Sequence, residues 1–181
     1  MAKLGRRGFL RGSVAALALA VPALALGGCG FRPLYGERSS SASTAKQLAS
    51  INIAPIPERI GQQLRNDLRL RLTPNGAPSR ADYILEVGIT ELREDLAIRD
   101  DASATLGNLQ VRATYRLRQA SDGAMLTQGL SRSAASYNIV RSQFASLVAE
   151  DDARNRAVEA ISEDIRLRLG LYFDGLDRKK N

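Results

Sequence analysis

Between residues 83 and 90 the chain reads YILEVGIT, and between residues 109 and 118 it reads LQVRATYRLR. In both stretches apolar residues occupy every second position, and polar or charged residues fill most positions between them. Side chains of a strand point alternately to the two faces of a sheet, so this period predicts two strands with one buried face. The pair decides the fold class, because a sheet covered on one face needs helices on that side only.

The segments around this pair extend the sheet to four strands. Residues 48–54 place Ile51 and Ile53 at alternating positions and predict a short first strand. Polar residues 99–105 predict the hairpin tip between the two central strands. Asp122-Gly123 supplies the positive φ that a tight turn needs, so a fourth strand is expected over residues 125–137.

Two helices complete the predicted fold. In residues 57–72 apolar side chains recur every fourth position after Pro57, which suits the first turn of a helix. From Ser142, a plausible N-cap, an apolar stripe continues to Tyr172. The order β-α-β-β-β-α predicts an α+β two-layer sandwich: a four-stranded, mostly antiparallel sheet with two helices on one face.

Residues 1–28 are expected to be a lipoprotein signal peptide. A cationic head precedes the apolar stretch 14–26, and Leu26-Gly27-Gly28-Cys29 is typical of a lipoprotein cleavage box. At about 1.5 Å per residue the apolar stretch covers roughly 20 Å, short of the ~30 Å membrane core. Cleavage between Gly28 and Cys29 would make the only cysteine the lipid-bearing first residue of the mature protein.

Two features of this region bear on the destination of the protein. Residues 6–11 read RRGFLR, which is similar to the twin-arginine export signal, although paired arginines also occur in general secretory leaders. Lipoproteins of this type carry a diacylglyceryl group and an N-acyl chain such as palmitate on the cysteine, and several chains anchor a protein durably. In such lipoproteins, aspartate directly after the cysteine is associated with retention in the inner membrane. Here Gly30 occupies that position, so the outer membrane is expected.

The leader also accounts for most of the excess positive charge. The chain carries 26 Lys and Arg against 19 Asp and Glu, for a net charge of +7. Four of the basic residues lie in the leader, which leaves 22 basic and 19 acidic residues in the mature part. Nucleic-acid binding is therefore not indicated. The mature part divides into a lipidated, Ser-rich flexible tether (29–46), one domain (47–175) and a basic tail (176–181).

Three short stretches carry a resemblance to a known family. Residues 29–36 read CGFRPLYG, residues 131–138 read SRSAASYN, and residues 142–145 read SQFA. Together with the size and the element order, they resemble the LptE family of lipopolysaccharide-assembly lipoproteins over nearly the whole mature chain. The resemblance implies a non-enzymatic protein without cofactor, lipid-anchored on the periplasmic side of the outer membrane. It also implies a complex with the LptD β-barrel, assistance in its assembly, and lipopolysaccharide binding.

One strand face is the candidate contact for lipopolysaccharide or for the barrel. Arg112, Arg116 and Arg118 alternate with apolar residues, so they share one side of their strand. Guanidinium groups bind phosphates and carboxylates in two-pronged geometry, and such groups abound in lipid A and its inner core. The alternative is an ordinary solvated face whose arginines pair with acids such as Glu86 on the next strand.

Other features favour weaker interpretations. Residues 178–180 could touch anionic lipid, although a terminal charge run is usually a solvated tail. Residues 31–35 could dock on a barrel wall or tuck against the domain. The chain has no histidine and no G-x-S-x-G or Walker A motif, and the consecutive acids 150–152 could not converge on a metal. A lipoprotein of another assembly or cell-wall complex, or remotely a hydrolase built by folding, remains the alternative.

Overall fold

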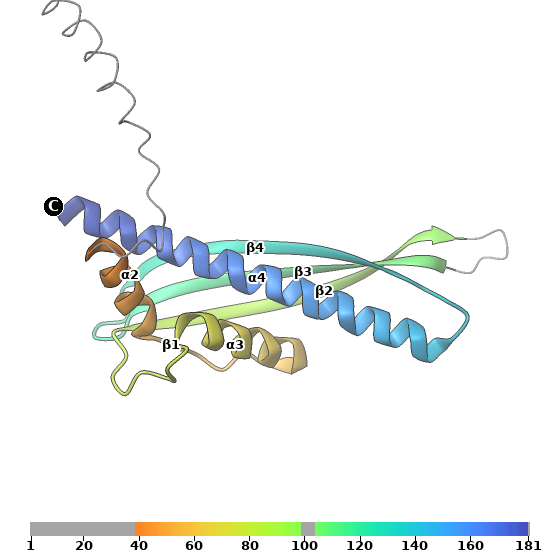
Figure 1. The fold of residues 1–181 in the computed structure, drawn as a ribbon, viewed down its shortest axis with the longest axis horizontal. Helices are drawn as coiled ribbons and strands as arrows, with labels where there is room; N and C mark the ends of the chain where they lie inside the picture. The colour runs from red at the N-terminus through yellow and green to blue at the C-terminus, as the bar shows by residue number, and fades with distance from the viewer. Residues whose placement is uncertain (1–38, 99–103, 181) are drawn as a thin grey trace, which may run out of the picture. The chain divides into compact units, whose positions relative to one another are not determined.

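A computed structural model describes residues 39–98 and 104–180 of the chain (Figure 1). Three helices and four strands follow one another along it. They are α2 (Ser39–Ala49), β1 (Ile51–Ile53), α3 (Glu58–Leu72), β2 (Tyr83–Ile98), β3 (Ala104–Gln119), β4 (Met125–Asn138) and α4 (Gln143–Lys180). The predicted α+β architecture is confirmed, with α2 as an additional helix.

The sheet has the strand order β1-β2-β3-β4, the same as along the chain. β1 runs parallel to β2, and the other two pairings are antiparallel. The predicted Asp-Gly turn joins β3 to β4, where the Gln119 amide donates to the Ala124 carbonyl at 2.9 Å. Of its residues only Gly123 has a positive φ, +71°, so the glycine alone supplies the left-handed position.

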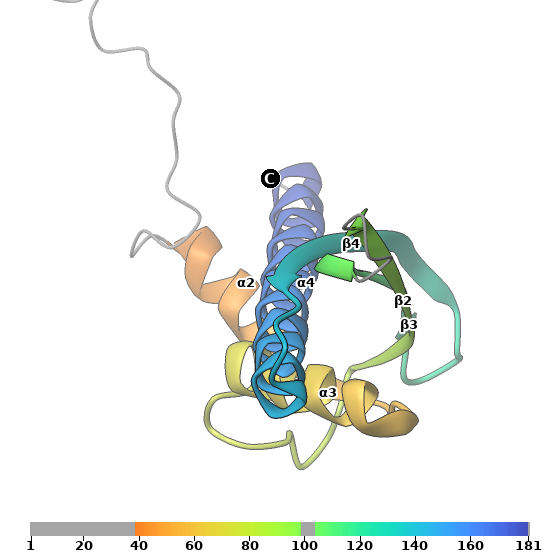
Figure 2. The same ribbon diagram turned by 90° about the vertical axis from the view of Figure 1, so that its right-hand side faces the viewer.

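One face of the sheet is buried by α3 and α4. Figure 2 shows the sheet curving around one side of α4, with α3 beside that helix. The odd-numbered positions of the strands point into this layer, and those in its middle, such as Leu85, Leu117 and Ala135, are buried. Leu64 and Leu68 of α3 and Ile161 and Ile165 of α4 meet them there. The even-numbered positions of β3 point to the opposite, open face, which confirms the predicted alternation.

The structure corrects the expected tether. Ser39–Ala49 form a helix where the composition predicts a flexible spacer as far as residue 46, and Leu48 belongs to this helix rather than to the first strand. Thr44 and Leu48 are buried, and the Ser43 hydroxyl and the Gln47 amide both donate to Asp177 of α4. Docking on α4 therefore orders a segment whose own composition gives little helix preference.

The C-terminal end and the hairpin tip also differ from expectation. Residues 176–180, predicted as a basic tail, continue α4, and Arg178 pairs with Asp174 one turn earlier. β2 and β3 extend beyond the predicted stretches to Ile98 and from Ala104. Residues 99–103 of the expected tip lie outside the described residues.

Candidate functional site

The open face of the sheet gathers the predicted arginines. Arg112, Arg116 and Arg118 stand at even positions of β3, on the side away from α3 and α4. A fourth arginine, Arg132 of β4, lies on the same face directly opposite Arg112 in the strand register. The sequence had not singled out Arg132, because its alignment with β3 depends on the length of the turn that joins the strands.

The register separates these arginines into two groups. Arg118 donates from Nε to a Glu86 carboxylate oxygen of β2 at 3.2 Å, which is the cross-strand pair expected of an ordinary solvated face. Arg112 and Arg132 face each other with like charge, an arrangement that disfavours the sheet unless an anion lies between them. Among the described residues, the side chains of Arg112, Arg116 and Arg132 make no ion pair or hydrogen bond. Their guanidinium groups thus have unused donors.

Apolar side chains border this basic group. Thr90 of β2 lies opposite Arg112, and Leu92 follows two residues later on the same face. Leu92 is 53% exposed. Leu130 of β4 lies opposite Thr114, between Arg112 and Arg116 along the strand. We call Leu92, Arg112, Arg116, Leu130 and Arg132 the basic face. It can bind an anionic group through the guanidinium groups while the leucines contact an adjoining apolar portion.

On the helix-covered side, β2 and α4 are joined by charges near the start of the helix. Arg154 of α4 donates to both oxygens of Glu91, at 3.0 and 3.3 Å, and to Glu150 at 2.9 Å. Arg93 donates to Glu150 at 3.0 Å. The hydrogen bonds that Arg154 donates to Glu91 are the largest cause of its pKa shift; they outweigh burial and raise the pKa of Arg154. These groups satisfy one another and serve to position α4.

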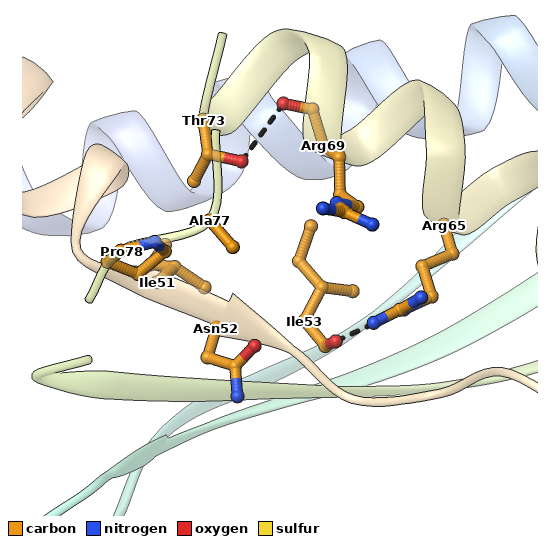
Figure 3. Close-up of a pocket in the computed structure, with 8 residues that line it drawn as sticks. All are labelled: Ile51, Asn52, Ile53, Arg65, Arg69, Thr73, Ala77 and Pro78. Carbon is orange, nitrogen blue, oxygen red and sulfur yellow. Dashed lines mark hydrogen bonds between the residues drawn. The ribbon is translucent and has the colours of Figure 1, made fainter. Parts of the chain in front are cut away.

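A small cavity adjoins β1, one of the two edge strands of the sheet. It holds about 40 Å³ between β1, α3 and the loop at Ala77 and Pro78. Figure 3 shows Arg65 donating to the Ile53 carbonyl, at 3.2 Å, from the helix above. That hydrogen bond covers part of the exposed strand edge, and the cavity has room for a few water molecules only.

The acids of residues 150–152 serve as ion-pair partners. Asp151 pairs with Arg154, and Asp152 pairs with Arg156 at 3.0 Å. No group of acidic or sulfur-bearing residues suited to a metal ion occurs within residues 39–98 and 104–180. In the same ranges no helix is long and apolar enough to cross a membrane.

Several predicted sites lie outside the described residues. They are the twin arginines, the cleavage position at Gly28 and Cys29, the lipid-bearing Cys29 itself, and the aromatic stretch 31–35.

Comparison with known proteins gives one family. The family model of LptE, described as lipopolysaccharide-assembly, matches residues 47–169, from the end of α2 well into α4. Comparison with curated proteins finds no match.

Solved structures share the fold. A Caulobacter crescentus CB15 protein described as a lipoprotein has a TM-score of 0.64 and 26% identity, covering 74% of this chain and 98% of that one. The minor lipoprotein of Acinetobacter baumannii has a TM-score of 0.55 and 18% identity, covering 68% and 92% of the two chains. Rare lipoprotein B of Shewanella oneidensis has a TM-score of 0.55 and 12% identity, covering 70% and 98%.

Proposed function

Because this chain belongs to the LptE family of lipopolysaccharide-assembly proteins, we propose that it forms a complex with an LptD-type β-barrel, assists its assembly and binds lipopolysaccharide. The family is one of non-enzymatic outer-membrane lipoproteins, and in this proposal Cys29 carries the lipid anchor on the periplasmic side. The observation that carries the proposal is the family match across 47–169, a range that includes all four strands.

The basic face supports the lipopolysaccharide part of the proposal. Arg112, Arg116 and Arg132 have no acidic partner among the described residues. Phosphate groups would relieve the repulsion between Arg112 and Arg132, which lie opposite each other. Leu92 and Leu130 lie beside them, where the apolar part of an amphiphile would find contact. In this proposal Arg118, already paired with Glu86, contributes less than its two neighbours on β3.

Co-purification tests the barrel partner. We expect the full chain, extracted from outer membranes in mild detergent, to elute with one β-barrel protein in a stable complex. Mass spectrometry of the complex identifies the partner. Elution as a monomer, or with another envelope machine, would contradict the proposal.

Binding to purified lipopolysaccharide tests the basic face. Joint replacement of Arg112, Arg116 and Arg132 with Ser should weaken binding at least tenfold, because hydrogen bonds to charged groups contribute about 1.5–3 kcal/mol each. A matched control replaces the exposed arginines Arg59, Arg80 and Arg141 with Ser and removes the same charge away from the face. If both triple variants bind lipopolysaccharide equally well, the basic face is an ordinary solvated sheet face and not the binding site. Arg118→Ser alone should have little effect.

A further inference from the structure

The seam between α3 and α4 contains a polar hollow. The two helices run side by side in the same direction, and their apolar residues Leu64, Leu68 and Ile161 are buried on the sheet side. Towards one end the Gln63 amide donates to Asn155 Oδ1 at 3.3 Å, and towards the other Arg71 pairs with Glu159 at 3.1 Å. A hollow of about 400 Å³ opens between these two bridges.

The hollow offers hydrogen-bonding groups that the protein itself leaves unused. Three amide side chains line it, those of Gln63, Asn66 and Asn155. The Oε1 atom of Gln63 is buried and accepts no hydrogen bond from any described residue, and Asn66 has no partner there either. An acceptor without a partner is unfavourable, so a ligand that donates to it would recover free energy.

The lining of the hollow carries two carboxyl groups and one guanidinium group. Asp67, Glu159 and Arg71 line it together, and Glu159 already accepts from Arg71. Burial raises the pKa of Asp67, Arg71 lowers it, and Glu159 raises it again. Two carboxylates against one guanidinium disfavour an anion, which separates this hollow from the basic face. Carboxylate and amide oxygens accept from hydroxyl groups, whereas amide and guanidinium nitrogens donate to them.

We propose that the hollow binds an uncharged, hydroxyl-rich ligand the size of one or two sugar units. Each sugar hydroxyl both donates and accepts, which matches the mixed donors and acceptors of the amides, Asp67 and Arg71. Val158 is the one apolar residue of the lining and is buried beneath the polar groups, so those polar groups form the contact surface. The volume lies in the range of about 300–1,000 Å³ that small-ligand sites occupy.

Calorimetry on the full chain, purified in detergent, tests the proposal with two probes. One is the core oligosaccharide of lipopolysaccharide after deacylation, dephosphorylation and reduction of its carboxyl groups, and the other is maltose as a free sugar. Binding of the oligosaccharide alone identifies a glycolipid as the source of the ligand, and binding of maltose identifies a free saccharide. If neither probe binds, the proposal is overturned.

Variants assign any binding to the hollow. Gln63→Leu and Asp67→Leu should each raise the Kd about tenfold, because each removes a hydrogen-bonding partner and leaves ligand hydroxyls unpaired. Gln62→Leu is the matched control, since Gln62 is the exposed neighbour on α3 and does not line the hollow. Asn66→Leu, at an exposed position, keeps the test valid if a more buried variant folds poorly. Unchanged affinity in all three lining variants would also overturn the proposal.

This site and the basic face can fail independently. The Ser triple variant of Arg112, Arg116 and Arg132 should bind the dephosphorylated probe as the parent chain does, because the hollow lies between the helices and the arginines lie on the open face of the sheet. Conversely, Gln63→Leu should retain the phosphate-dependent part of lipopolysaccharide binding. Loss of probe binding in the Ser triple variant would place the sugar on the basic face instead and overturn the proposal.

Discussion

At the scale of single residues, two tyrosines of the core lie against glycines on the neighbouring strand. Tyr115 of β3 pairs in register with Gly129 of β4, and Tyr137 of β4 pairs with Gly107 of β3. A Cβ added to Gly129 would lie 2.5 Å from the Tyr115 hydroxyl, and one added to Gly107 would lie 2.4 Å from the Tyr137 ring. Each glycine therefore provides the space that the opposite ring occupies.

This contact predicts a loss of stability on adding one methyl group. Gly129→Ala should lower the free energy of unfolding by about 1–3 kcal/mol, because Tyr115 is only 5% exposed and has little room to move. Urea unfolding measures the loss. Gly175→Ala is the control, since a Cβ there meets no atom within 4 Å and alanine favours a helix. If Gly129→Ala has the same free energy of unfolding as the parent protein, the Tyr115 ring moves aside without loss of stability, which contradicts the prediction.

At the scale of elements, the sequence predicts those whose own residues carry a clear period. α3 was expected over 57–72 and spans Glu58–Leu72, and β4 was expected over 125–137 and spans Met125–Asn138. α2 shows no such period, because Ser, Thr and Ala differ too little in hydrophobicity to mark a buried face of a helix. Its burial at Thr44 and its hydrogen bonds to Asp177 come from a helix more than a hundred residues later in the chain.

The ion pair between Arg71 of α3 and Glu163 of α4, at 3.0 Å, predicts a dependence of stability on pH. The hydrogen bond from Arg166 is the largest cause that lowers the pKa of Glu163; burial opposes it, and the charges of Arg166 and Arg71 add to it. A lowered pKa in the folded state means that this carboxylate stabilises the fold above its ordinary pKa of 4.5. That contribution is lost as the pH falls through the lowered value.

Glu163→Gln should therefore reduce stability at pH 7 by about 0.2–1 kcal/mol, the range for partly exposed ion pairs. At a pH well below the folded-state pKa the two proteins should unfold alike. Urea titrations at pH 7 and at pH 2 make the comparison. A difference that persists undiminished at low pH would mean that Glu163 acts through packing rather than charge.

At the scale of the whole domain, the interior face of α4 changes along its length. Small residues, Ala149, Ala153 and Ala157, contact the core over residues 149–157, in its first half. Larger residues do so over residues 158–173, mostly in its second half: Val158, Ile161, Ile165, Leu169 and Phe173. Burial of apolar area contributes roughly 25 cal/mol per Å², so the second half is held more strongly. The charges around Arg154 hold the first half, and Phe144 and Leu147 remain exposed there.

Native-state hydrogen exchange should reveal this gradient. We expect amides of residues 147–152 to exchange faster than those of 161–173, and raised salt to widen the difference, because salt weakens the ion pairs more than the apolar contacts. Uniform protection along α4 would contradict the expectation and indicate that the helix opens as one unit.

The candidate sites could be predicted only in part, for a reason that belongs to this same scale. Strand parity alone places Arg112, Arg116 and Arg118 on one face. The register of three strands decides the rest: it pairs Arg118 with Glu86 and places Arg132 opposite Arg112. The hollow depends on how two helices that β2, β3 and β4 separate along the chain come to lie together, which no local pattern in the sequence records.

The strand order of the sheet has a consequence for how the chain folds. β2, β3 and β4 are adjacent both in sequence and in space, so each pairing closes a short connection, whereas β1 must find β2 across the whole of α3. Closing a longer loop costs more chain entropy, and local pairings assemble faster. We expect the three-stranded meander to form early and the edge strand β1 to join afterwards, so that the segment nearest the N-terminal region is the last part of the sheet to close.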